Sequence, residues 1–283
     1  MAASYPKIGR AVRLWQRHIA IPAEHGSWVF LFSPLLIGLF LGGRVGAGSL
    51  LLTLAILAGF LIRQPVTIMV KAYSGRRPRS ELAPARFWAV LYGVLGGIAV
   101  FWLVILGHSY VLWMVVPAIP VFGWHLWLVS RRAERKKPGV EIVASGVLAL
   151  SAPAAYWVGL GGYSPAGWLI WGLCWLQAAG SIVYAYLRLE QRGLKQGLSV
   201  SDRIRLGKRS LMYNTFSLLL SIGFSFAHLV PTLLPLAFGV QWLETLWGVL
   251  NPAIGAKPTQ IGIRQLAVSS LFTVVFIVTW LFF

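Results

Sequence analysis

Long apolar runs separated by short polar connections form the main pattern of this chain. A bilayer core of ~30 Å is crossed by roughly 20 residues of α-helix, and nine runs approach that length. The predicted spans cover about residues 24–42, 49–70, 87–106, 110–129, 140–158, 165–187, 211–229, 232–249 and 264–283. The pattern therefore predicts an all-α, polytopic membrane protein with nine transmembrane helices.

Basic residues are concentrated in alternate connections. The N-terminal arm and the connections after predicted spans two, four, six and eight together carry 23 of the 25 Lys and Arg residues. The other connections carry only Arg44, and Arg63 lies inside a span. Because cytoplasmic loops are rich in Lys and Arg, we predict a cytoplasmic N-terminus and an external C-terminus. Residues 1–23 then form a basic cytoplasmic arm, and residues 24–283 form a single transmembrane domain.

The composition agrees with a membrane location. Of the 283 residues, 58% are hydrophobic and only 11% are charged, which leaves too little polar surface for a soluble globule. A net charge of +18 would suggest nucleic acid in a soluble domain. Here the basic clusters flank apolar runs, as expected of loops that face anionic headgroups. We therefore expect membrane lipids as partners and no nucleic acid.

The segment "FLIRQPVTIMVKAYSGRRPR", residues 60–79, places a cation within an apolar run. Arg63 precedes Lys71 by about 12 Å of helix, so it lies below the headgroups. A cation there costs roughly 2.5 to 3.5 kcal/mol unless a partner or a wet cavity relieves the cost. Pro65 lacks an amide hydrogen and interrupts the helical ladder, so we predict that Arg63 and Gln64 face a polar cavity.

Two other interpretations of Arg63 remain open from the sequence. The guanidinium could extend to the headgroups, since long basic side chains snorkel. It could also form a structural ion pair with a carboxylate, and the candidate partners are Glu24, Glu141 and Glu244.

Acidic residues are scarce, with seven in the whole chain. Glu24 and Glu141 each follow a proline near a predicted helix start, where a carboxylate is favourable beside the helix dipole and free amides. His25 could transfer protons beside Glu24, but adjacent residues on a helix point about 100° apart and would not form a direct dyad. A packed or headgroup-contacting histidine is the other interpretation.

The chain resembles the UbiA superfamily of intramembrane prenyltransferases in its layout. The resemblance rests on nine spans, on long cytoplasmic loops after spans two and six, and on two stretches. These stretches are "IPAEHGSWVFLFSPLLIGLFLGG" and "PGVEIVASGVLALSAPAAYWVGLGGYS". It implies a UbiA-like arrangement of nine helices with a cavity open toward the cytoplasmic leaflet.

A second resemblance is narrower. The opening "P-x-E-H-G-x-W…P-L-L-x-G", the "R-Q-P" of span two and the "K-P-x-x-I-G-I-R" before the last span are similar to the YwiC-like family of bacterial membrane proteins. This resemblance runs over nearly the whole chain. It implies a multi-pass protein of the bacterial cytoplasmic (inner) membrane.

The chain departs from the UbiA pattern at its metal-binding motifs. Active members of that superfamily carry aspartate-rich motifs after spans two and six that hold magnesium against a prenyl diphosphate. If Gly75 marks the glycine that follows the first motif, the positions of its acids are Thr67, Ile68 and Lys71, at and just after the end of span two. In the loop after span six the corresponding stretch is Arg188, Leu189 and Glu190, or alternatively Asp202 and Arg203. Because magnesium prefers several carboxylates, we expect no metal site and no cofactor.

The basic first loop could instead engage an anionic headgroup directly, since arginine forks match phosphate and carboxylate geometry. We therefore predict an amphipathic isoprenoid, quinone or lipid ligand with a polar or anionic head. The predicted ligand-binding residues are Arg63, Gln64, Lys71, Arg76, Arg77, Glu141, Arg188 and Glu244.

Other functions remain open. One is a divergent prenyltransferase that uses Glu24, His25 or Asp202 as catalytic groups and requires magnesium. A transporter and an assembly subunit of a larger membrane complex are further alternatives. Whether the protein is an enzyme is therefore left undecided by the sequence.

Overall fold

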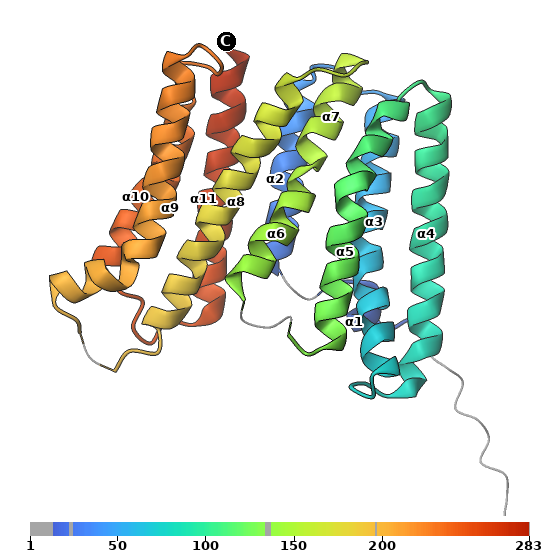
Figure 1. Ribbon diagram of the computed structural model, residues 1–283, viewed down its shortest axis with the longest axis horizontal. Helices are drawn as coiled ribbons and strands as arrows, with labels where there is room; N and C mark the ends of the chain where they lie inside the picture. Colours follow the sequence, from blue (N-terminus) through green and yellow to red (C-terminus); the bar gives the residue numbers. More distant parts are fainter. Residues whose placement is uncertain (1–13, 23–24, 134–136, 196, 283) are drawn as a thin grey trace, which may run out of the picture.

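The computed structural model describes residues 14–22, 25–133, 137–195 and 197–282. These residues form helices and short connections, and none of them forms a β-strand, so the all-α prediction is confirmed. Figure 1 shows the long helices side by side, with their axes roughly across the longest dimension of the molecule.

The elements follow one another along the chain with short connections. In order they are α1 (Arg17–Ala20), α2 (His25–Leu41), α3 (Ala47–Tyr73), the 3₁₀ helix η1 (Arg79–Glu81), α4 (Leu82–Ile105), the 3₁₀ helix η2 (Ser109–Met114), α5 (Val115–Ser130), α6 (Pro138–Ala149), α7 (Ser151–Leu160), α8 (Ala166–Gln191), α9 (Val200–Phe226), α10 (Pro235–Leu250) and α11 (Pro258–Leu281).

Each predicted span coincides with one of these helices or with two consecutive ones. The range 110–129 becomes η2 and α5, and the range 140–158 becomes α6 and α7. Among the described residues, six helical units are long and apolar enough to cross a membrane. Residues Gly26–Leu41 of α2 are also apolar but form a shorter helix. The six units are α3, η1 with α4, η2 with α5, α6 with α7, α8, and α11. These apolar helices support a multi-pass membrane protein.

Helix α2 joins two groups of helices. It packs against α6 and α7 on one side and against α8 and α11 on the other. Helices α3, α4 and α5 lie beyond α7, whereas α9 and α10 lie beyond α8 and α11 (Figure 1).

Small residues allow α2 and α7 to approach closely. A Cβ atom at Gly38 would overlap the backbone carbonyl of Ala152, and one at Gly42 would lie 2.9 Å from the Cα of Gly159. Close backbone approach through Gly and Ala is a common packing mode of membrane helices, where lipid provides no hydrophobic drive for association. On the other side of α2, the hydroxyls of Ser33 and Thr273 form a hydrogen bond to α11.

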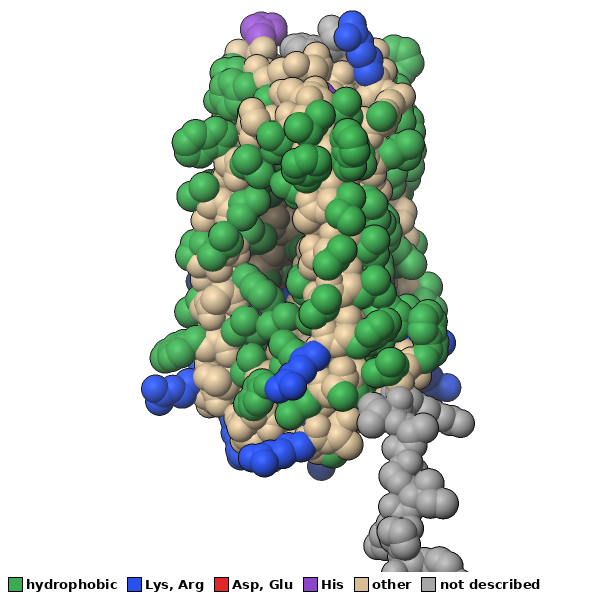
Figure 2. Space-filling view, turned by 90° about the vertical axis from the view of Figure 1, so that its right-hand side faces the viewer, with side chains coloured by type: hydrophobic (Ala, Val, Ile, Leu, Met, Phe, Trp, Pro, Cys, Tyr) green, Lys and Arg blue, Asp and Glu red, His purple; other side chains and the backbone are tan. Residues whose placement is uncertain are grey.

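Charge is unevenly distributed along the helix axes. On the face drawn in Figure 2, hydrophobic side chains cover the middle, and most of the Lys and Arg side chains gather at one end. Helix α1 lies at this end, and α11 finishes at the opposite end (Figure 1). We call the first the basic end.

Candidate functional site

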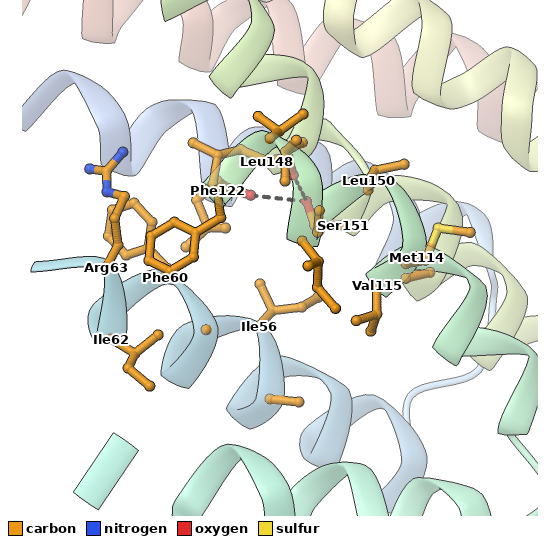
Figure 3. A pocket seen from close by; sticks show the side chains of 18 of the residues that line it. Ile56, Phe60, Ile62, Arg63, Met114, Val115, Phe122, Leu148, Leu150 and Ser151 are labelled. Atoms are coloured by element: carbon orange, nitrogen blue, oxygen red, sulfur yellow. Dashed lines mark hydrogen bonds between the residues drawn. The ribbon is translucent and has the colours of Figure 1, made fainter. Parts of the chain in front are cut away.

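A cavity of about 370 Å³ lies between α3, α5 and the α6–α7 pair, with contributions from α2, α4 and η2. Most of its wall is apolar, with Ile56, Phe60, Met114 and Phe122 among the lining residues (Figure 3). Its polar side chains are Arg63, His125 and Ser151. The cavity therefore combines a hydrocarbon-like wall with a few polar groups, which is the usual composition of a small-molecule pocket.

Arg63 lies at one side of this cavity. Figure 3 shows it next to Phe60, and its Cζ atom is 5.2 Å from the centroid of that ring. A guanidinium over an aromatic face is attracted by the ring quadrupole, whose face has a negative electrostatic potential. The half-buried Arg63 thus brings positive charge to an otherwise apolar wall.

Gln64 has a different neighbour. Its Nε2 atom donates a hydrogen bond to the backbone carbonyl of His18, at 2.8 Å, and so ties α3 to α1. Helix α3 continues through Pro65 to Tyr73, although Pro65 leaves the carbonyl of Leu61 without its helical donor. Gln64 is therefore a link between helices in this structure.

The remaining basic residues of the first loop lie beyond the cavity. Lys71 is in the last turn of α3, two turns after Arg63. Arg76 donates a hydrogen bond to the carbonyl of Val129 at the end of α5. Arg77 pairs with Glu81, four residues later, at 3.0 Å. These contacts hold the α3–α4 connection at the basic end.

The wall opposite α3 contains a break between two helices. The Leu150 amide donates to Val147, three residues earlier, and Pro153 offers no amide to the carbonyl of Ala149. The Ser151 hydroxyl donates to Leu148 at 2.7 Å and to Leu31 of α2 at 3.4 Å. Irregular backbone at membrane depth occurs where protein or a cavity surrounds it, and here it borders the cavity.

A second polar centre joins α8, α10 and α11. The Glu244 carboxylate accepts two hydrogen bonds from Arg264, at 2.6 and 2.8 Å, and one from the Tyr184 hydroxyl at 2.7 Å. The Arg264 guanidinium also lies 3.5 Å from the centroid of a Trp247 ring. Glu244 is thus held within the C-terminal helices, and α10 packs against α8, α9 and α11.

Arg188 belongs to the same region. It is only 7% exposed, and its Nη1 atom donates to the carbonyls of Gly248 and Asn251, each at 2.7 Å, and to Gln191 at 2.9 Å. Cations are favourable at helix C-termini, where carbonyls lack helical partners. Arg188 therefore caps the C-terminus of α10. The contacts that the structure describes for its guanidinium are to residues of the protein itself.

The predicted catalytic residues occupy different places. Glu24 lies outside the described residues, and α2 begins at His25. Asp202 is in the first turn of α9, where its amide and carboxylate both bond to Ser199 and its carboxylate pairs with Arg205 at 3.0 Å. Such contacts are typical of a helix cap.

Glu141 accepts a hydrogen bond of 2.6 Å from the Tyr186 hydroxyl, which joins α6 to α8. Among the predicted ligand-binding residues, all of which the structure describes, Arg63 is the one that lines the 370 Å³ cavity. The others lie at the basic end or among the C-terminal helices.

Two lining residues and one ion pair were not predicted. No role was assigned to His125 or to Ser151 from the sequence. Arg264 was counted only as a loop cation. Its position six residues into α11, opposite a lone carboxylate in α10, was the available signal.

The family match lies in the N-terminal part of the chain, which also contains the residues that line the cavity. A family model described as "YwiC-like protein" matches residues 21–156. A Bacillus subtilis (strain 168) protein named "Uncharacterized protein YwiC" is 26% identical over 238 residues, which cover 82% of this chain and 91% of that protein. Both matches support the YwiC-like family. All residues that line the cavity, from Leu31 to Ala154, fall within the YwiC-like match. No solved structure matches the chain.

Proposed function

We propose that this multi-pass membrane protein binds an amphipathic isoprenoid, quinone or lipid in the cavity between α3, α5 and the α6–α7 pair. The ligand's polar or anionic head lies at Arg63, and its tail lies along the apolar wall. The observation that carries the proposal is a cavity of about 370 Å³ in which a guanidinium borders an apolar lining.

The chemistry of the wall supports this class of ligand. Hydrocarbon chains and isoprenoid units gain free energy from contact with side chains such as Ile56, Met114 and Phe122. A phosphate, carboxylate or quinone oxygen would accept hydrogen bonds from Arg63, and charge-assisted bonds are strong where water is scarce. His125 offers a second polar contact on the same cavity.

We also propose the finer topology. The nine spans would be α2, α3, α4, η2 with α5, α6 with α7, α8, α9, α10 and α11, in a UbiA-like arrangement. The N-terminus would lie in the cytoplasm, and the membrane would be a bacterial inner membrane. The basic end supports this orientation, because Lys and Arg accumulate in cytoplasmic loops.

The test compares the molecules that co-purify with the wild-type protein and with two cavity variants. Arg63→Gln removes the charge, and Gly59→Leu inserts a side chain at a lining position where a Cβ meets no neighbouring atom. Quantitative mass spectrometry of extracts should show about a tenfold loss of one amphipathic species in both variants.

The control is Gly97→Leu. Gly97 is exposed on α4, meets no atom within 4 Å of an added Cβ and does not line the cavity. This variant should retain the wild-type set of molecules. Identical extracts from all four proteins would overturn the proposed function.

A transporter is the second candidate, favoured by the break between α6 and α7 at the cavity wall. Discontinuous helices often form substrate sites in secondary transporters. Flux of an amphipathic anion into proteoliposomes that requires Arg63 would favour this function over static binding.

A further inference from the structure

A second hollow, of about 480 Å³, lies at the basic end between the start of α6, the end of α8 and the first turns of α9. Its lining includes Tyr186, Leu187, Glu190, Arg209 and Ser210. None of these residues lines the cavity at Arg63, so the two spaces are separate. The hollow lies at the basic end, where the proposed topology places the lipid headgroups.

Ser210 is the unusual residue of this hollow. It is 1% exposed, and its hydroxyl has no hydrogen-bond partner among the described residues. Two other buried serines of α9 bond to carbonyls of their own helix, Ser217 to Tyr213 at 2.9 Å and Ser221 to Leu218 at 2.7 Å. A buried polar group without a partner is costly and points to a bound molecule. The Ser210 hydroxyl is thus available to a ligand in the hollow.

The same hollow contains both signs of charge. Arg209 lies on α9 and Glu190 on α8, and neither forms an ion pair with a described residue. The Arg209 guanidinium lies 5.9 Å from the centroid of the Tyr213 ring. Both side chains are exposed and line the hollow, so a head with a single charge would be attracted by one of them and repelled by the other. A head with both charges satisfies the two side chains together.

We propose that this hollow binds a phospholipid whose head carries a phosphate and a primary ammonium, as in phosphatidylethanolamine. The phosphate accepts hydrogen bonds from the Ser210 hydroxyl and from Arg209. The ammonium donates to the Glu190 carboxylate, and an acyl chain follows the apolar side chains of Leu187 and Leu206.

The experiment uses the full-length protein in nanodiscs that contain equal amounts of phosphatidylethanolamine, phosphatidylglycerol and phosphatidylcholine. Native mass spectrometry then counts the lipids that remain bound after release from the disc. The wild-type protein should retain phosphatidylethanolamine above the other two. Ser210→Ala should reduce that retention about tenfold, because it removes one hydrogen bond to a charged phosphate.

Two charge variants separate the parts of the head. Arg209→Gln should reduce retention of all three lipids. Glu190→Gln should abolish the preference for phosphatidylethanolamine over phosphatidylglycerol, because the ammonium loses its counter-charge.

The matched control is Ser217→Ala, which removes a buried hydroxyl that bonds within α9. It should retain phosphatidylethanolamine as the wild type does. Wild-type retention that does not depend on the head, or equal retention by Ser210→Ala and wild type, would overturn the proposal. Because Ser210→Ala deletes a hydroxyl without a protein partner, its melting temperature in detergent should stay at or above that of the wild type.

Discussion

Charged side chains within the helices have separate tasks. Arg63 borders a cavity, Arg188 closes the end of α10, and Arg264 pairs with Glu244. A charge inside a membrane needs a partner or a wet space, and the sequence alone identifies only the need. The three-dimensional neighbours determine which solution each residue uses.

The Glu244–Arg264 pair provides a test of this point. Glu244 is 9% exposed and Arg264 is 42% exposed. Arg264→Met would leave a buried carboxylate without its cation and should lower the free energy of unfolding by about 2 kcal/mol, which thermal melts in detergent would measure.

The comparison is Arg77→Met, which breaks the pair with Glu81. The Glu81 carboxylate is 16% exposed, against 9% for Glu244, so this change should cost less than about 1 kcal/mol. Adding Glu244→Gln to Arg264→Met should restore most of the lost stability. Equal losses from Arg264→Met and Arg77→Met would contradict this account.

At the level of helices, close packing of α2 and α7 places Ser151 at the cavity wall. The contact depends on Gly38 and Gly42, because the facing backbone leaves no room for a Cβ atom at either position. The pair also positions the α6–α7 break, since Ser151 reaches the carbonyl of Leu31 on α2. Loss of this contact would therefore disturb the cavity as well as the fold.

Gly38→Ala should separate α2 from α7 and lower the free energy of unfolding by about 1 to 3 kcal/mol, the usual cost of overpacking. The control Gly223→Ala places the same methyl group on exposed α9, where no atom lies within 4 Å. It should be neutral or stabilising, since Ala is the better helix former. Melting curves of both variants decide the question, and a Gly38→Ala protein as stable as Gly223→Ala would exclude the packing role.

For the whole molecule, the expected topology can be measured by cysteine labelling. Cys174 is buried and should not react with the reagent, so labelling reports on the introduced cysteines. With an impermeant maleimide, Arg44→Cys should react from outside intact cells, and Arg77→Cys only after the membrane is opened. Labelling of both positions from the same side would reject the nine-span arrangement, because these residues lie at the two ends of α3.

The long apolar runs were enough to place the helices, because each span must satisfy its own backbone hydrogen bonds in lipid. It could not show that one predicted span is two helices, since Leu150 and Ser151 lie in an apolar run without a polar boundary. The break depends on Pro153 and on contacts with α2. The sequence also singled out Arg63, because a cation inside the bilayer is costly. It gave no such signal for Ser210, whose lack of a hydrogen-bond partner depends on how the helices pack.

The sequence by itself determined the all-helical, membrane-type character of this protein and the alternation of its basic connections, because both follow from local runs of residues. Tertiary structure alone decided which polar groups meet. It brought Glu244 to Arg264 and Glu141 to Tyr186. It also placed Arg63, His125 and Ser151 as the polar side chains of the cavity wall. Those pairings join residues far apart in the chain, so they depend on how the helices pack.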